Sequence, residues 1–130
     1  MYLSSALVSD RLSTWIDIMQ TSFMPMLKEA VFTTIPLTLI TFIIGLILAT
    51  LTALARISGS RILQWIARIY VSIIRGTPLL VQLFIIFYGL PTLNIEVEPY
   101  TAAVVGFSLN VGAYASEIIR ASILSIPKGQ

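Results

Sequence analysis

The sequence predicts an all-α integral membrane protein with about three transmembrane helices and an N-terminal interfacial helix. Of its 130 residues, 57% are hydrophobic and only 11% are charged, with a mean hydropathy of +0.93. A typical soluble domain carries about 25% charged residues, so this chain lacks the polar surface that would coat a water-soluble globule. Uncharged runs long enough to cross a bilayer, with charges gathered at their ends, give the same prediction.

Residues 1–30 predict an amphipathic helix on the extracytoplasmic membrane surface. Asp10, Asp17 and Lys28 fall away from a set of apolar residues at near-helical spacing, as expected for a helix lying in an interface. Pro25 is expected to interrupt this helix. The apolar set is Leu12, Trp15, Ile16, Met19, Phe23, Met26 and Leu27.

Residues 31–130 are expected to form a second region, whose first span lies near residues 33–55. The uncharged run there exceeds the roughly 18 residues that a spanning helix needs. Small residues repeat within it at four-residue spacing, which allows another helix to approach closely. These residues are Gly45, Ala49 and Ala53.

The second span is predicted near residues 69–90. Arg61, Arg68 and Arg75 recur seven residues apart and share one helical face, with isoleucines opposite, so the region before the span is amphipathic. The sequence Gly76-Thr77-Pro78 should bend or break the helix. We therefore expect a span that is kinked at the proline.

The third span is predicted near residues 100–120. An uncharged run from Pro99 to Ser116 follows a polar loop that contains Asn94, Glu96 and Glu98. The run is rich in small residues and long enough to span.

The charges predict how the spans are oriented. Because successive spans alternate in direction, most of the eight basic residues fall on one side, which the positive-inside rule makes cytoplasmic. The N-terminus and the acidic loop then lie outside, and the C-terminal end lies inside. The net charge of +2 is therefore a topology signal, and no nucleic-acid partner is expected. The six cytoplasmic basic residues are Arg56, Arg61, Arg68, Arg75, Arg120 and Lys128.

The chain contains neither cysteine nor histidine, which excludes disulfides, thiol nucleophiles and histidine relays. No phosphate-cradling glycine loop and no cluster with metal-ligand spacing is present. We therefore predict no catalytic residue, no metal site, no cofactor and no enzyme activity.

Four polar residues in the predicted spans are candidates for a transport pathway: Gln82, Asn110, Tyr114 and Glu117. Asn110, Tyr114 and Glu117 follow i, i+4, i+7 spacing and share a helical face. An ionisable residue in a membrane marks a functional site by default. Two interpretations of Glu117 stay open, a pairing with Arg120 or a direct transport role. For Gln82 the alternative is a hydrogen bond between helices.

Four segments of the chain carry a recognisable pattern together. The first runs from Phe32 to Thr38, and the second contains Arg75, Gly76, Thr77 and Pro78 followed by Leu-Leu-Val-Gln. The third runs from Gly112 to Ala121 and the last is Ser125-Ile-Pro-Lys-Gly-Gln130. These segments resemble the permease subunits of bacterial polar amino acid ABC importers, and most nearly the cystine-type permeases. The resemblance covers roughly residues 22–130.

The resemblance implies the first part of a type I ABC importer transmembrane domain in the bacterial cell membrane. Its implied partners are an ATP-binding cassette ATPase subunit, an extracytoplasmic solute-binding protein and a second permease subunit, identical or paralogous. ATP would be hydrolysed by the ATPase partner. The implied residues that lead toward the ATPase coupling loop are Ser125, Pro127, Lys128, Gly129 and Gln130.

The sequence departs from the family's pattern at its end. In the family, Lys-Gly-Gln is followed by a Glu-Ala-Ala coupling segment, whereas here the printed chain stops at Gln130. The resemblance therefore predicts a permease truncated before the coupling loop. Two alternatives stay open: a membrane assembly or interaction module that does not transport, and a small self-oligomerising exporter.

Overall fold

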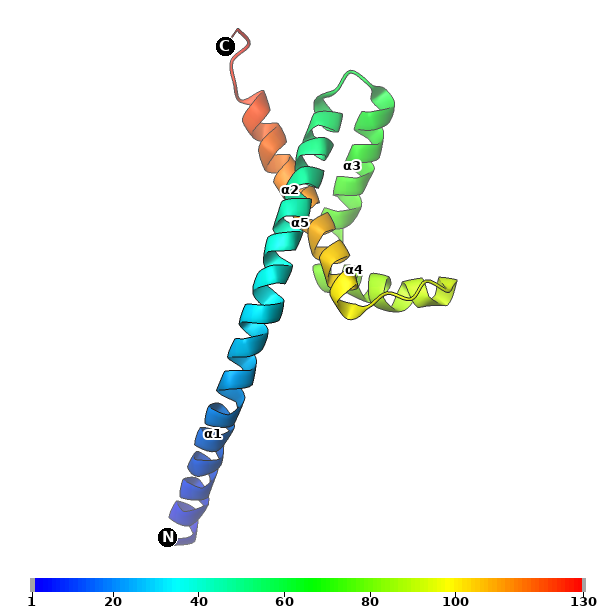
Figure 1. The fold of residues 1–130 in the computed structure, drawn as a ribbon. Helices are drawn as coiled ribbons and strands as arrows, with labels where there is room; N and C mark the ends of the chain where they lie inside the picture. Colours follow the sequence, from blue (N-terminus) through cyan, green and yellow to red (C-terminus); the bar gives the residue numbers. More distant parts are fainter. Residues whose placement is uncertain (1, 130) are drawn as a thin grey trace. The chain divides into compact units, whose positions relative to one another are not determined.

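The computed structural model describes residues 2–129, and in that range the chain is helical without any strand (Figure 1). This confirms the predicted all-α class. The α-helices are α1 (Tyr2–Glu29), α2 (Ile35–Ile57), α3 (Arg61–Gly76), α4 (Leu79–Phe84) and α5 (Pro99–Leu124). Shorter elements are the π-helices η1 (Ala30–Thr34) and η2 (Ile85–Gly89) and the 3₁₀ helix η3 (Leu90–Leu93). The chain divides into two compact units, one up to Pro36 and one from Leu37 onward.

The first unit consists of α1, η1 and the first residues of α2. The prediction that Pro25 interrupts the helix is wrong, since α1 runs through Pro25 to Glu29. A proline removes only one backbone donor, and the helix can absorb that loss as a local bend. The backbone departs from α geometry further on, in the π-helical turn at Ala30–Thr34. No residue of α1 is buried, so its apolar side chains are open to the surroundings, among them Trp15 and Phe23.

The second unit is built on close packing of α2, α3 and α5. The buried residues of α2 repeat at four-residue spacing and are Thr41, Gly45, Ala49 and Ala53. The buried residues of α5 are also small, namely Ala102, Gly106, Ser108, Gly112, Ala113 and Ser116. Small side chains let helix backbones approach closely, as in membrane helix pairs generally. The predicted small-residue seam of the first span is therefore confirmed.

Two glycines mark where the approach is tightest. A Cβ atom on Gly45 would lie 2.5 Å from Cγ1 and 2.6 Å from Cβ of Val111. A Cβ atom on Gly112 would lie 2.7 Å from the hydroxyl of Tyr70 and 3.0 Å from Cβ of Leu48. The Tyr70 hydroxyl donates a hydrogen bond of 2.6 Å to the carbonyl oxygen of Leu109. These contacts join α2, α3 and α5 at one level.

The turn between α2 and α3 is capped by a side chain. Ser60 accepts a hydrogen bond from the backbone N–H of Leu63, which satisfies a free donor at the start of α3. Gln64 donates to the carbonyl oxygen of Ser58 across the same turn. Figure 1 shows that this turn and the C-terminal end of α5 lie at the same end of the second unit. That placement agrees with spans that alternate in direction.

The helix break at residues 76–78 is sharper than the predicted kink. Thr77 and Pro78 are both extended, and the axes of α3 and of the helical stretch Leu79–Leu93 differ by 105°. The helix α3 begins at Arg61, so it includes the amphipathic stretch predicted before the span near residues 69–90. Two extended residues in succession let the chain change direction, which a lone proline inside a helix does not.

Among residues 2–129, two helical stretches are long and apolar enough to cross a membrane, one within Tyr2–Ile57 and the other α5. The bent pair of α3 and Leu79–Leu93 makes a third if it counts as one span.

Candidate functional site

An ionic cluster joins the three packed helices of the second unit. The carboxylate of Glu117, on α5, forms an ion pair with Arg56 at the end of α2. Its other oxygen, Oε2, lies 3.8 Å from Nη1 of Arg75 near the end of α3. The side chains of Arg56 and Glu117 are only 15% and 28% exposed, so their attraction is less screened than that of a surface pair. We call Arg56, Arg75, Tyr114 and Glu117 the Glu117 cluster.

Tyr114 enters the same cluster through its ring. The guanidinium carbon of Arg75 lies 5.4 Å from the ring centroid of Tyr114, within the range of a cation–π interaction. Tyr114 and Glu117 lie three residues apart on α5, so they face the same side and both contact Arg75. Arg75, which belongs to one of the segments that resemble the permease family, therefore contacts two of the four candidate pathway residues, Tyr114 and Glu117.

The expected pairing of Glu117 with Arg120 is wrong. The partners of Glu117 come from α2 and α3, because packing of those helices on α5 brings their arginines to the carboxylate. The Nε atom of Arg120 is buried and has no hydrogen-bond partner. Sequence reasoning did not select Arg56 as a site residue. The available signal was that Arg56 ends the first span on the side where Glu117 ends the third.

Gln82 lies at the helix break and not in the Glu117 cluster. Its Nε2 atom donates to the carbonyl oxygens of Ile74 at 2.7 Å and Thr77 at 3.0 Å, and to the Thr77 hydroxyl at 2.9 Å. These bonds satisfy acceptors that the broken helix leaves free. Gln82 is 8% exposed, and its Oε1 atom is buried without a partner. Within the segment Arg75–Pro78, Thr77 accepts hydrogen bonds from Gln82, and Pro78 is the N-cap residue directly before α4. Gly76 has open space around it.

We expect Gln82→Met to loosen the break between α3 and α4. Methionine keeps the length of the side chain but removes the amide donor, which leaves buried carbonyl oxygens unsatisfied at a cost of about 1–3 kcal/mol. Spin labels on α3 and α4 should report a broader distance distribution than in the parent chain. The matched control is Gln20→Met on the exposed surface of α1. An unchanged distribution in Gln82→Met would show that the proline alone sets the bend.

Asn110 forms no hydrogen bond or ion pair with another candidate residue in the described part of the chain. It is half-buried on α5, and within residues 2–129 its side chain makes no hydrogen bond. The residues expected to lead toward an ATPase follow α5: Ser125, Pro127, Lys128 and Gly129 are exposed, and the Ser125 hydroxyl donates to the carbonyl oxygen of Ser122. Gln130 lies outside the described residues.

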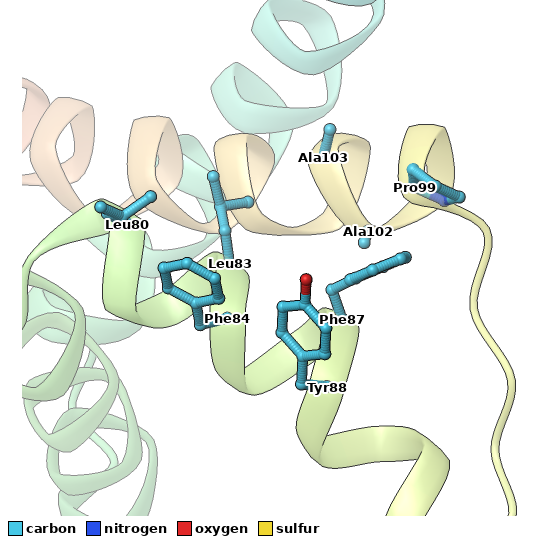
Figure 2. A pocket seen from close by; sticks show the side chains of 8 residues that line it. All are labelled: Leu80, Leu83, Phe84, Phe87, Tyr88, Pro99, Ala102 and Ala103. Atoms are coloured by element: carbon cyan, nitrogen blue, oxygen red, sulfur yellow. The ribbon is translucent and has the colours of Figure 1, made fainter.

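An apolar pocket of about 230 Å³ lies between α4, η2 and the start of α5 (Figure 2). The rings of Phe84 and Tyr88 stack at 5.5 Å, and Phe87 meets Tyr88 edge-on at 5.0 Å. Sequence reasoning missed this pocket, although the spacing of the three aromatic residues places them near one helical face. It is lined by Leu80, Leu83, Phe84, Phe87, Tyr88, Pro99, Ala102 and Ala103.

The chain is thus a helical membrane protein in which α2, α3 and α5 pack through small residues. Comparison with known proteins identifies its homologues. It is homologous to permease proteins of amino acid ABC transporters. It is 63% identical over 114 residues to the L-cystine transport system permease protein TcyB of Bacillus subtilis, covering 88% of this chain and 49% of that protein. It is 47% identical over 107 residues to the arginine transport system permease protein ArtQ of the same organism, covering 82% and 49%.

A solved structure shows the same arrangement of helices. The crystal structure of an amino acid ABC transporter with histidines matches with a TM-score of 0.78 and 33% identity, over 86% of this chain and 52% of that one. No protein-family model matches the chain. The chain spans about half the length of the curated relatives it matches.

These comparisons confirm the resemblance and the membrane fold that the sequence predicts. The relatives are transport permease proteins rather than enzymes, and none of those named is an assembly module. The roles of individual residues stay predictions.

Proposed function

We propose that this chain forms the N-terminal part of a permease subunit in an ATP-driven amino acid importer, and that it contributes to the translocation path. The observation that carries this proposal is 63% identity over 114 residues with an L-cystine permease protein. The agreement of the helix arrangement with an amino acid ABC transporter structure supports it.

In this proposal, polar residues of α5 form this chain's contribution to the translocation path. Asn110 carries an amide that has no hydrogen-bond partner in the described part of the chain, although it lies in an apolar helix. Polar groups in a spanning helix are costly unless they pair or face a polar cavity. Tyr114 and Glu117 continue the same face toward the helix end, where Arg56 and Arg75 hold the carboxylate. Gln82 would border the path at the helix break.

The proposed orientation places the α2–α3 turn and the end of α5 in the cytoplasm and the N-terminus outside, in the bacterial cell membrane. The excess of basic residues around that turn supports it. Residues 125–130 would then lead toward an ATP-binding cassette ATPase subunit. An extracytoplasmic solute-binding protein would deliver the amino acid, and a second permease subunit would complete the path.

We expect Asn110→Leu to reduce uptake without preventing assembly. The test uses a chimera in which this chain replaces the matching part of the Bacillus subtilis L-cystine permease protein, expressed in cells that lack their own cystine permease. Leucine removes the amide while preserving the helix. If the amide contacts the substrate or the water that solvates it, uptake of labelled L-cystine should fall about tenfold or more, which corresponds to a loss of about 1.4 kcal/mol.

The matched control is Thr101→Leu, an exposed polar residue at the start of the same helix. Membrane abundance and co-purification with the ATPase subunit should match the parent chimera in both variants. Equal uptake by Asn110→Leu and the parent would remove Asn110 from the path.

A further inference from the structure

The side chains of α1 divide into an apolar side and a charged side. An α-helix advances by about 100° per residue, and at that spacing eight apolar residues between positions 8 and 27 fall within about one third of the circumference. All five charged residues of α1 fall outside that third, as do Ile18 and Met24. We call the set of eight the apolar side of α1: Val8, Leu12, Trp15, Ile16, Met19, Phe23, Met26 and Leu27.

The apolar side is open and needs little water. No residue of α1 is buried, and Trp15 and Phe23 are 63% and 62% exposed. Ser9 extends this side toward the start of the helix, and its hydroxyl donates to the carbonyl oxygen of Ala6 at 2.9 Å. A hydroxyl that is satisfied within its own helix does not require water. An exposed apolar surface of this kind marks contact with a membrane or a protein.

The span that follows α1 favours lipid as that contact. α2 has 23 residues and is roughly 35 Å long, so it fills the hydrocarbon core of about 30 Å alone. α1, η1 and α2 follow one another without a loop, so the chain cannot turn back and α1 does not form a second span beside α2. The last residues of α1 therefore lie at the membrane surface.

The width of the apolar side also favours lipid over a partner helix. The seam of a coiled coil is a narrow stripe of two residues in seven. The apolar side of α1 is wider, since it includes both Trp15 and Ile16 and both Met26 and Leu27. A wide apolar stripe opposite charged residues is typical of a helix that lies in a membrane interface.

The junction between α1 and α2 allows a change of direction. In η1 the backbone N–H of Ile35 bonds to the carbonyl oxygen of Ala30, which gives a wider turn than an α-helix. Pro36 has no N–H for the carbonyl oxygen of Phe32, which α geometry would require. The same order recurs at η2, which ends two residues before Pro91. Wide turns and prolines are the usual sites of sharp helix bends.

We propose that α1 lies along the membrane surface with its apolar side in lipid, and that the helix turns into the bilayer at residues 30–36. Trp15 belongs to a residue type that is enriched at membrane–water interfaces. Three acidic residues oppose two basic ones on α1, so attraction to anionic lipid adds little and burial of the apolar side supplies the affinity. The proposal concerns membrane insertion and not transport, so it can fail while the importer function holds.

The test measures the depth of spin labels on the full chain in phosphatidylcholine vesicles. The chain has no cysteine, so a single introduced cysteine carries the only label. Oxygen concentrates in lipid and a nickel chelate stays in water, so the ratio of their collision rates with the label reports depth. This ratio should be several-fold higher on the apolar side than on the charged side. The apolar-side variants are Ile16→Cys, Met19→Cys and Phe23→Cys, and the matched controls along the same stretch are Thr14→Cys, Asp17→Cys and Thr21→Cys.

Further measurements locate the turn and the source of the affinity. Labels at Leu39→Cys and Ile43→Cys, both exposed on α2, should lie progressively deeper, whereas the three apolar-side labels should share one depth. Adding phosphatidylglycerol to the vesicles should leave every ratio unchanged. In the Ile16→Cys chain, Met19→Asp with Phe23→Asp should raise nickel access several-fold. The control pair on the charged side, Thr14→Asp with Thr21→Asp, should not raise it.

Each variant must keep the helical circular dichroism of the parent. Because no residue of α1 is buried, the single-cysteine series remains the test if the aspartate pair does not insert.

Equal nickel access on both sides would place α1 in water and overturn the proposal. Apolar-side labels shielded from both reagents would place them against a protein, and spin–spin broadening would identify that protein as a second copy of this chain. Depth that increases steadily from residue 14 to residue 43 would describe one straight helix without the turn. A contrast that appears only with phosphatidylglycerol would assign the affinity to charge. Each of these results overturns the proposal, as does a folded aspartate pair whose ratio equals that of the parent.

Discussion

Replacing Gly45 with alanine should destabilise the packing of α2 against α5 by about 1–3 kcal/mol, the usual cost of overpacking a close-packed core. The added Cβ would lie 2.6 Å from Cβ of Val111 and 3.3 Å from the carbonyl oxygen of Ser108. Neither atom can rotate away, because one is fixed to the α5 backbone and the other belongs to it. The two helices must therefore separate. The measurement is the thermal stability of the detergent-solubilised chain by fluorescence-detected gel filtration.

Two other glycine variants should lower stability less than Gly45→Ala does. Gly59→Ala meets nothing within 4 Å and should not lower stability. Gly106→Ala approaches the Cδ2 tip of Leu83 at 2.5 Å, but that side chain can change rotamer, so the loss should be smaller than for Gly45→Ala. Val111→Gly added to Gly45→Ala removes the clash and should recover part of the stability in a double-mutant cycle. Equal stability of Gly45→Ala and Gly59→Ala would contradict the packing described here.

Glu117→Gln should be the other strongly destabilising change, with a loss of about 2–3 kcal/mol. Removing one partner from a buried ion pair typically costs about 3–5 kcal/mol, and the partial exposure of Glu117 reduces this. The substitution leaves Arg56 unpaired while Arg68, Arg75 and Arg120 continue to repel it. The same thermal assay applies, in detergent at low salt.

The order of effects within the cluster is the sharper test. Arg56→Gln should cost more than Arg75→Gln, because the Arg56 side chain is 15% exposed and that of Arg75 is 46% exposed. Glu96→Gln, an exposed acid in the loop before α5, serves as the control and should leave stability unchanged. A Glu117→Gln chain as stable as the control would show that the ion pairs contribute nothing measurable.

The parts of the fold that could be predicted are those set by local pattern. Run lengths identified α2 and α5 as helices able to cross a membrane, and four-residue spacing identified the seam at Gly45. The continuation of α1 through Pro25 and the 105° angle at Pro78 could not be predicted. Proline marks a weak point in a helix, but surrounding contacts decide whether the backbone bends slightly or breaks.

The candidate site was predictable in its α5 residues and not in their partners. Spacing places Tyr114 and Glu117 on one face, yet the choice of Arg56 and Arg75 over Arg120 depends on how α2 and α3 cross α5. Gln82 illustrates the same limit. Its hydrogen-bond acceptors are backbone carbonyls that become free only because α3 ends where it does.

The central claim, that this chain is part of an amino acid importer permease, is tested most directly by ATP-dependent L-cystine uptake. The chimera with the Bacillus subtilis permease protein is reconstituted in liposomes with that system's ATPase and solute-binding protein. We predict uptake that requires ATP inside the liposomes and the binding protein outside. A chimera that is folded, inserted and bound to the ATPase but moves no amino acid would contradict the claim.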